Sequence, residues 1–265
     1  MYSKIKLASK YISYYVSASN GKGHGVHSPF VFEFITKILN DDKDYDCFKA
    51  IEELRSNLKR DNTVLTIEDF GAGSRVHKQT QRAVSDIASS SLKPKKFAQL
   101  LFRMVNFYKP SSVLELGTSL GITTSYLAFA QNNIPVITME GAKEIAGVAK
   151  NNFQKLQLKN IEIIKGNFDE TLPVVLNKFG SIDFAFIDGN HRKEPTLQYF
   201  QQLLKKVNHN SILIFDDVHW SKQMEEAWEI IKTNEVVTLS IDLFYIGIVF
   251  FRREQKEKQH FTIRV

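Results

Sequence analysis

The stretch "VLELGTSLGITTSYLA" (residues 113–128) decides the fold of this chain. The residues VLEL lead into a turn that contains Gly117 and Gly121, and a helix-like segment follows the turn. A strand, a glycine turn and a helix in this order let the backbone pass close to a ligand, with the amides of the helix N-terminus directed at it. The stretch therefore predicts an α/β fold with a ligand at this turn.

Short apolar runs recur after this stretch. They cover residues 136–140, 161–165, 182–188 and 212–216, and they are typical of strands buried on both faces. Helix-like segments lie between them, which implies a parallel sheet with helices on both sides. The segment "VVTLSIDLFYIGIVFFRRE" (residues 236–254) contains two strand-like runs with a short break, as in an antiparallel pair. We expect a Rossmann-like, doubly wound fold whose mostly parallel seven-stranded sheet includes a terminal antiparallel strand.

The first 92 residues have a different texture, rich in Ser, Lys, Asp and aromatic residues. The segment "SPFVFEFITKIL" (residues 28–39) has a Ser cap, Pro at the first helical position and apolar residues at helical spacing. The segment "CFKAIEELRSNLKR" (residues 47–60) has the pattern of another helix. We therefore predict a mostly helical extension over residues 1–92 and a ligand-binding domain over residues 93–265.

Composition places the chain among ordinary globular proteins. It has 265 residues, with 35 Lys and Arg against 29 Asp and Glu, and this mild excess is most often a solvated basic surface. A single cysteine, Cys47, excludes an intrachain disulfide framework and a Cys-rich zinc site, which favours a cytoplasmic setting. We expect no signal peptide at the N-terminus, and the apolar run at 245–251 is too short to cross a membrane.

The chemistry of the glycine turn distinguishes between cofactors. Its G-x-x-x-G spacing differs from the dinucleotide fingerprint, because Ser119 stands where the second glycine would approach a pyrophosphate. Glu115, just before the turn, would repel a pyrophosphate and suits a cationic ligand. Glu140 ends the next strand, where an acid can accept hydrogen bonds from both ribose hydroxyls. An acid near an amino acid moiety and an acid on a ribose describe S-adenosylmethionine rather than NAD.

The third strand of the predicted sheet adds to this site. Asn167 and Phe168 follow it and would lie beside the adenine. The alternative for the glycine turn is an ordinary connection between a strand and a helix. We expect the cofactor site to comprise Glu115, Gly117, Thr118, Ser119, Gly121, Glu140, Gly141, Asn167, Phe168 and Asp188.

From residue 95 to residue 252 the chain resembles the class I S-adenosylmethionine-dependent methyltransferases. The stretch "ELGTSLG" (residues 115–121) corresponds to their motif I, Glu140 to their ribose acid and "FAFIDGNH" (residues 184–191) to their motif IV. Within that superfamily the chain is most similar to the catechol and caffeoyl-CoA type O-methyltransferases and to the metal-dependent sugar O-methyltransferases. The resemblance implies transfer of a methyl group to a hydroxylated small molecule, either phenol- or catechol-like or a sugar.

A second group of acids follows the later strands. Asp188 ends the fourth run, and "IFDDVHW" (residues 214–220) places Asp216 and Asp217 at the end of the fifth. Adjacent parallel strands would bring these three carboxylates together, where they require a cation, and Mg2+ suits such oxygen ligands best. In the metal-dependent enzymes that the chain resembles, acidic residues at matching positions bind a divalent ion, although some members have Asp-Asn at the pair. The alternative is that these acids only cap a loop and the following helix, which already has Ser221 as a cap.

A general base is also predicted. His191 lies three residues after Asp188, where the catechol-type enzymes commonly carry a Lys. An imidazole, with an ordinary pKa of about 6.5, suits proton removal from a hydroxyl, although a solvated loop histidine is the alternative. His219 and Trp220 are candidates for the lining of the acceptor pocket, with packing an equal alternative for Trp220.

Other signals point to rival functions. The basic clusters at residues 75–82, 93–96 and 252–258 would suit an RNA or protein methyltransferase without a metal, but nucleic acid is disfavoured because the chain has no added RNA-binding module. A sensor that binds the cofactor without catalysis is a third possibility, and the three acids argue against it. The glycine-rich "EDFGAGSR" (residues 68–75) and the pair His24 and His27 are not expected to bind cofactor or metal. We expect the N-terminal extension to shape the acceptor site and to provide a contact for a homodimer.

Overall fold

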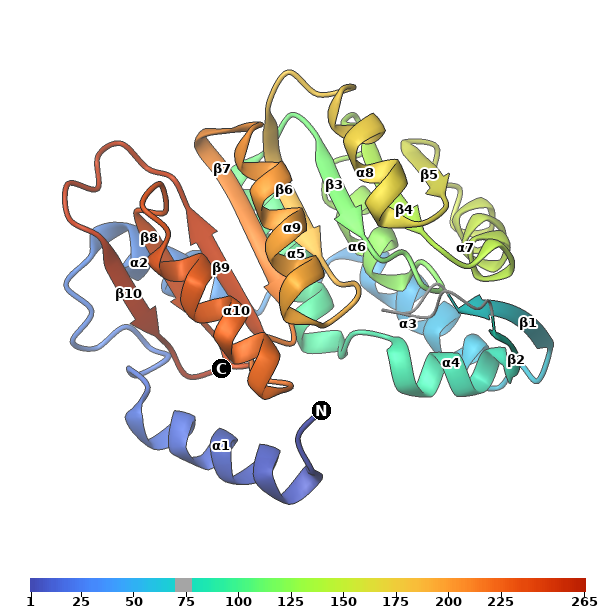
Figure 1. Ribbon diagram of the computed structural model, residues 1–265, viewed down its shortest axis with the longest axis horizontal. Helices are drawn as coiled ribbons and strands as arrows, with labels where there is room; N and C mark the ends of the chain where they lie inside the picture. Colours follow the sequence, from blue (N-terminus) through green and yellow to red (C-terminus); the bar gives the residue numbers. More distant parts are fainter. Residues whose placement is uncertain (70–77) are drawn as a thin grey trace. The chain divides into compact units, whose positions relative to one another are not determined.

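The computed structural model describes residues 1–69 and 78–265, which form two compact units (Figure 1). The first unit combines residues 1–41 with residues 176–265, and the second comprises residues 42–175. The predicted boundary between residues 92 and 93 is a different division and remains a prediction. Most of the glycine-rich segment at 68–75 lies outside the described residues.

The second unit contains three parallel strands in the order β3-β4-β5. They are β3 (Val113–Leu116), β4 (Val136–Glu140) and β5 (Ile161–Lys165). Their bounds are those predicted, because each is an apolar run that ends at a glycine or a charged residue. All four residues of β3 are buried, as expected for a strand covered on both faces.

Helices and a hairpin complete the second unit. Rings of Phe48, Phe102 and Tyr126 pack edge to face, with centroids 4.9 Å and 5.3 Å apart, and so join α3, α5 and α6. The Tyr126 hydroxyl donates to Glu52 on α3 at 2.8 Å, so part of the N-terminal extension is fixed to the glycine-turn helix. The elements are α3 (Asp46–Leu58), β1 (Val64–Asp69) paired antiparallel with β2 (Lys78–Ala83), α4 (Val84–Ser91), α5 (Lys95–Tyr108), α6 (Ile122–Ala130), α7 (Lys143–Lys155) and α8 (Phe168–Leu176).

The first unit contains five strands in the order β10-β8-β9-β7-β6. They are β6 (Ile182–Ile187), β7 (Val207–Asp216), β8 (Leu239–Asp242), β9 (Ile246–Phe250) and β10 (Gln259–Thr262). Strand β6 is parallel to β7, and β9 is antiparallel to both β7 and β8, which confirms the predicted antiparallel pair. Apart from the hairpin of β1 and β2, the described part of the chain contains eight strands, whereas seven were predicted. The additional strand, β10, has the polar sequence QHFT and therefore lacks the apolar run by which the others were found.

The helices of the first unit are α1 (Lys4–Ser17), α2 (Pro29–Phe34), α9 (Lys193–Leu204) and α10 (Lys222–Thr233), with a π-helical turn at Ile35–Leu39. Figure 1 shows α9 and α10 side by side over the strands of this unit. Ser28 and Ser221 accept hydrogen bonds from backbone amides of α2 and α10, as their predicted cap positions require. In the described part of the chain, no helix is long and apolar enough to cross a membrane.

Candidate functional site

The carboxyl ends of β3, β4 and β5 are joined by backbone hydrogen bonds. The amides of Gly117 and Thr118 both donate to the Met139 carbonyl at 3.0 Å, and the amide of Gly166 donates to the Glu140 carbonyl at 2.9 Å. The three loops predicted to hold the cofactor therefore start at one edge of this group of strands. Ligands of open parallel sheets bind at such an edge.

The glycine turn has a left-handed backbone at three of its residues. Gly117, Ser119 and Gly121 have φ values of 110°, 48° and 81°. At Gly121 the reason for glycine is also packing, because an added Cβ would lie 2.5 Å from the ring of Phe153 on α7. Close approach to a ligand is therefore not the only requirement at this position.

Glu140 connects two of the cofactor loops. Its carboxylate accepts hydrogen bonds from the amide of Ser119 at 2.8 Å and from the amide of Ala142 at 2.9 Å. Burial raises the pKa of Glu140, and the amides of Ala142 and Ser119 oppose that rise without cancelling it. The acid predicted to bind the ribose is thus held beside the first turn, and its contact with a ribose remains a prediction.

Glu115 is fully buried on β3. Its Oε2 accepts hydrogen bonds from the hydroxyls of Thr124 at 2.5 Å and Thr138 at 2.6 Å, whereas its buried Oε1 has no hydrogen-bond partner within the described residues. Burial raises the pKa of Glu115 to about 7, the threonine hydroxyls lower it, and the charge of Glu140 raises it further. A buried carboxylate oxygen that lacks a donor fits a cationic ligand, so Glu115 and Glu140 are compatible with S-adenosylmethionine.

Asn167 and Phe168 lie at the start of α8. The Asn167 side chain accepts a hydrogen bond from the Asp169 amide at 3.1 Å, and its carbonyl accepts bonds from Thr171. Asn167 therefore shapes the loop after β5, and the predicted contact of both residues with adenine remains a prediction. Gly141, also predicted for the cofactor site, lies in the loop after Glu140 and is half-buried.

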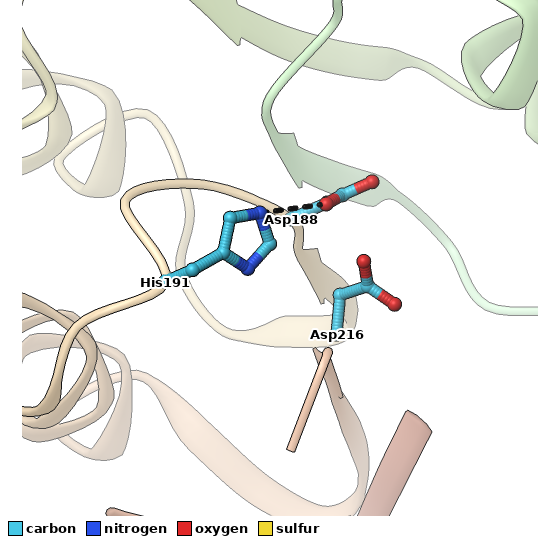
Figure 2. Close-up of side chains that lie close together, drawn as sticks. All are labelled: Asp188, His191 and Asp216. Carbon is cyan, nitrogen blue, oxygen red and sulfur yellow. Dashed lines mark ion pairs between the residues drawn. The ribbon is translucent and has the colours of Figure 1, made fainter. Parts of the chain in front are cut away.

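Asp188, His191 and Asp216 form a compact group in the first unit (Figure 2). Each offers one ligand atom within 4.8 Å of the others. Asp188 follows β6, Asp216 is the buried last residue of β7, and the two strands are parallel neighbours. Nε2 of His191 lies 3.5 Å from Oδ1 of Asp188, and Figure 2 shows the Asp216 carboxylate turned to the same space. Two carboxylates and an imidazole are a donor set that fits a divalent cation.

Asp217 takes a different place from the one predicted for the third metal ligand. Its carboxylate lies 3.9 Å from Nδ1 of His191, on the opposite ring nitrogen from Asp188. Its amide donates to the Tyr245 carbonyl at 2.7 Å, and its φ is 53°. The structure therefore brings His191, predicted as the base, into the group, with an acid near each of its ring nitrogens.

The loops that carry this group have an unusual backbone. Asn190, His191 and Asp217 have φ values of 69°, 25° and 53°, in the region that L-residues rarely adopt. Such residues cost on the order of 1 kcal/mol each and gather at functional sites. The side-chain amide of Asn190 donates a hydrogen bond to the Tyr199 hydroxyl on α9 at 3.1 Å, and this bond helps to hold the loop after β6.

His219, predicted to line the acceptor pocket, lies in a hydrogen-bonded network. Its Nε2 is 2.8 Å from Oδ2 of Asp242, its Nδ1 is 3.1 Å from Oε1 of Glu225, and its ring stacks on Phe244 at 5.2 Å. The indole of Trp228 donates to the same Asp242 oxygen at 2.9 Å. Sequence reasoning missed these acids, because 23 and six residues separate them from the histidine. Trp220 is half-buried, and its carbonyl accepts a hydrogen bond from the Tyr2 amide.

Tyr245 is a further residue of the site that the sequence did not indicate. Its backbone bonds to Asp217, and 38% of its side chain is exposed. Its ring centroid lies 5.1 Å from that of Phe244 and 6.0 Å from that of Tyr11 on α1. Burial raises the pKa of Tyr245, and the neighbouring Tyr11 and Asp217 raise it further. An exposed aromatic surface therefore adjoins the acids at the end of β7.

A comparison with protein families gives one match over the centre of the chain. Residues 114–218 match the family model described as a methyltransferase domain. An uncharacterized protein of Acanthamoeba polyphaga mimivirus is 34% identical over 73 residues, or 26% of this chain. The chain spans about a third of that relative's length, 33%.

Solved structures share the fold at low sequence identity. The methyltransferase PaMTH1 of Podospora anserina, bound to SAH, is 12% identical with a TM-score of 0.60, over 95% of this chain and 98% of that one. The O-methyltransferase TomG of Streptomyces achromogenes, involved in tomaymycin synthesis, is 19% identical with a TM-score of 0.52, over 61% and 82%. A provisional caffeoyl-CoA O-methyltransferase of Staphylococcus aureus is 18% identical with a TM-score of 0.55, over 63% and 88%. These identities establish a shared fold and nothing narrower.

Proposed function

We propose that this chain, which carries a class I S-adenosylmethionine-dependent methyltransferase domain over residues 114–218, methylates a hydroxyl oxygen of a small acceptor with the help of a divalent cation. The family match spans both motifs on which the resemblance was based and agrees with it at the level of a methyltransferase domain. The proposal for the acceptor and the cation is supported above all by the group formed by Asp188, His191 and Asp216.

The second unit would hold the cofactor. Glu140 would accept hydrogen bonds from the ribose, and Glu115 would face the positive charge of the amino acid moiety. The bound cofactor supplies a methyl group on a sulfonium, which is activated toward attack. The turn from Gly117 to Gly121 would bring backbone close to it.

The first unit would activate the acceptor. A hydroxyl is a poor nucleophile until it loses its proton, and a divalent cation held by Asp188 and Asp216 would lower the pKa of a hydroxyl beside it. His191 would take the proton on a ring nitrogen, with Asp188 and Asp217 orienting the ring. The deprotonated hydroxyl oxygen would then attack the methyl carbon of the bound cofactor, with S-adenosylhomocysteine as the leaving group.

His191 can fill only one of two roles at a time. A ring nitrogen that binds the cation cannot also accept the proton from the acceptor. We propose the role of base, with Asp188 and Asp216 as the carboxylates that would hold the cation. If His191 were a ligand instead, His191→Gln would weaken Mn2+ binding in calorimetry, whereas loss of a base would leave that affinity unchanged.

The aromatic surface at Tyr245 favours a phenolic acceptor over a sugar. The Tyr245 carbonyl accepts a hydrogen bond from the Asp217 amide, and the ring of Tyr11 lies 6.0 Å from the ring of Tyr245. Aromatic side chains stack on planar rings in offset or edge-to-face arrangements. A phenol held against Tyr245 would present its hydroxyl in the neighbourhood of the acids.

The deciding experiment measures transfer of a labelled methyl group to a catechol probe and to a sugar probe, with EDTA and after Mg2+ is restored. We expect labelled catechol, loss of label with EDTA and recovery with Mg2+. The matched variants are Asp216→Asn and Asp44→Asn, because Asp44 is an exposed acid that lies outside the carboxylate group. Label that appears in RNA or protein from a host extract and ignores EDTA would overturn the proposal in favour of a macromolecular acceptor.

A further inference from the structure

The helix α1 is fixed firmly to the first unit by one of its faces. The Tyr2 hydroxyl and the Lys10 ammonium both donate to Glu225, at 2.7 Å and 3.0 Å. Tyr14 is buried, its hydroxyl donates to the Ile263 carbonyl, and its ring lies 5.2 Å from that of Phe244. The orientation of α1 on this unit is therefore set, and its opposite face points away from the contacts that hold it.

That opposite face is apolar. We call it the outer stripe, and its members are between 49% and 85% exposed: Ile5, Ile12, Tyr15 and Val16 on α1, together with Met1, which precedes the helix. Ile5, Ile12 and Val16 fall within an arc of about 40° at 3.6 residues per turn. Among the described residues, five of the twelve exposed large hydrophobic side chains belong to this stripe. Packing within the unit does not explain the apolar residues of the outer stripe, because the face of α1 that packs on the unit is formed by Leu7, Tyr11 and Tyr14.

Basic groups flank the outer stripe and acids are absent from its surroundings in the sequence. The first 20 residues contain Lys4, Lys6 and Lys10 and no Asp or Glu. Lys4 and Lys6 are exposed, and at 100° per residue they lie about 100° to either side of Ile5. At the other end of the helix, the guanidinium of Arg264 lies 4.8 Å from the ring of Tyr15. Apolar side chains between cationic ones are the pattern of helices that lie in a membrane interface.

We infer that the outer stripe docks on an anionic membrane surface. The stripe would enter the boundary between headgroups and acyl chains, while Lys4, Lys6 and Arg264 would meet anionic headgroups. A second copy of this chain would fit less well, because it would offer the same stripe and the same lysines without a counter-charge. The inference does not depend on the proposed reaction, because it concerns only α1 and its attachment to the first unit.

Vesicle flotation tests the inference with the full chain. We expect the protein to float with vesicles that mix phosphatidylcholine and phosphatidylglycerol, to float poorly with phosphatidylcholine alone, and to be released by salt. The triple variant Ile5→Ser, Ile12→Ser, Val16→Ser should bind at least about tenfold less, because three buried apolar side chains are lost. The control replaces three exposed apolar residues elsewhere, Val174→Ser, Ile230→Ser and Val236→Ser, and should bind like the wild type.

Each other result counts against the inference. Equal binding by the stripe variant and the control variant would show that the outer stripe is not the docking surface. A wild-type protein that binds neither vesicle, but forms a dimer that the stripe variant dissociates in light scattering, would assign the stripe to a second copy. Circular dichroism and thermal unfolding of the two triple variants would identify a loss of binding that came only from misfolding. In that case Lys4→Glu with Lys6→Glu gives the answer, because unchanged flotation of that variant would overturn the inference.

Discussion

Two histidines in the first unit each lie between two acids, and the two sites differ in nearly every other respect. His219 is bound at 2.8 Å and 3.1 Å, its ring is covered by Phe244, and 21% of its side chain is exposed. His191 has acids at 3.5 Å and 3.9 Å, a φ of 25°, and 33% of its side chain exposed. The first arrangement is closed and holds α1, through Glu225, to the unit. The second is open, and its distances leave room for an ion or a substrate between the groups.

The difference shows that residue types alone do not identify a catalytic histidine. A histidine whose hydrogen bonds are all made within the protein stabilises the fold, because its proton has partners already. A histidine on a strained loop, with its acids beyond hydrogen-bond distance, is held in place by the backbone and gains its partners from a ligand. Substitutions at each histidine and at acids of both units separate the two kinds of site.

The largest effect is expected at the open site from Asp216→Asn. We expect turnover to fall about 10³-fold, because the change removes charge that would hold the cation, while the affinity for S-adenosylmethionine stays unchanged. Initial rates with saturating Mg2+, together with titration calorimetry of the cofactor, measure both quantities. A variant with wild-type turnover would remove the basis for the carboxylate group as a catalytic site.

His191→Gln should lower turnover about 10²-fold, the usual contribution of a positioned general base. We also expect a free energy of unfolding close to that of the wild type. Initial rates give the turnover, and urea unfolding gives the stability. A variant that is fully active but unfolds more easily would show that His191 stabilises the fold, which is the role assigned to His219.

Glu140 shares the closed geometry of His219 but is predicted to act on a ligand. Glu140→Ala should weaken binding of S-adenosylmethionine about 10- to 100-fold, because the ribose would lose its acceptor. Titration calorimetry measures this affinity, and the exposed Glu162→Ala on β5 provides the control. Wild-type affinity in the Glu140 variant would mean that its bonds to Ser119 and Ala142 serve the loops alone.

His219→Gln should act on stability and depend on pH. Burial lowers the pKa of His219, but the hydrogen bonds and charges of Asp242 and Glu225 outweigh burial and raise the pKa above its ordinary value. The stabilisation is therefore complete below the ordinary value of about 6.5 and is lost as pH rises through the higher pKa of the folded protein. We expect a loss of about 2 kcal/mol at low pH that shrinks at high pH.

Urea unfolding of the His219 variant at several pH values checks this, with the exposed His209→Gln as the control. A deficit that is equal at all pH values would show that the ionised form of His219 does not contribute. A deficit that grows with pH would contradict the direction of its pKa shift.

Glu115 sharpens the comparison, because it is a buried acid whose carboxylate accepts hydrogen bonds from two threonine hydroxyls. Burial, opposed by two threonine hydroxyls, raises its pKa to about 7, so the folded protein binds a proton that the unfolded chain releases. We expect stability to fall by about 3 kcal/mol as pH rises from about 4.5 to about 7, and Glu115→Gln to remove that slope. Cofactor affinity should rise with pH in the wild type alone, and a rise in the variant as well would exclude Glu115 as the group that attracts the cationic ligand.

Much of the fold could be predicted because its signals are local. The strands at 113–116, 136–140 and 161–165 have the predicted bounds, since each is an apolar run with a clear end. Strand β10 could not be found in this way, because its pairing with β8 comes from a distant segment and its own sequence is polar. The same reasoning applies to Glu225 and Asp242, whose partnership with His219 depends on α10 and β8.

The candidate site was predicted in its members but not in its arrangement. Asp216 and Asp217 are adjacent in the sequence, yet only Asp216 joins Asp188 and His191 in the compact group. The reason is the left-handed backbone at Asp217, which no sequence pattern at a non-glycine residue announces. Tyr245 was missed for a related reason, because it adjoins the site only through the antiparallel pairing of β7 with β9.

The contact between Gly121 and Phe153 has a consequence for how such a sequence would change over evolutionary time. A descendant that abandoned catalysis would still need glycine at 121, because any side chain there would collide with Phe153. Asp216 is buried, and replacing its carboxyl by an apolar group would remove the desolvation cost of a buried charge. In a lineage that lost the activity, we therefore expect Gly121 to stay unchanged and the acids to be substituted first.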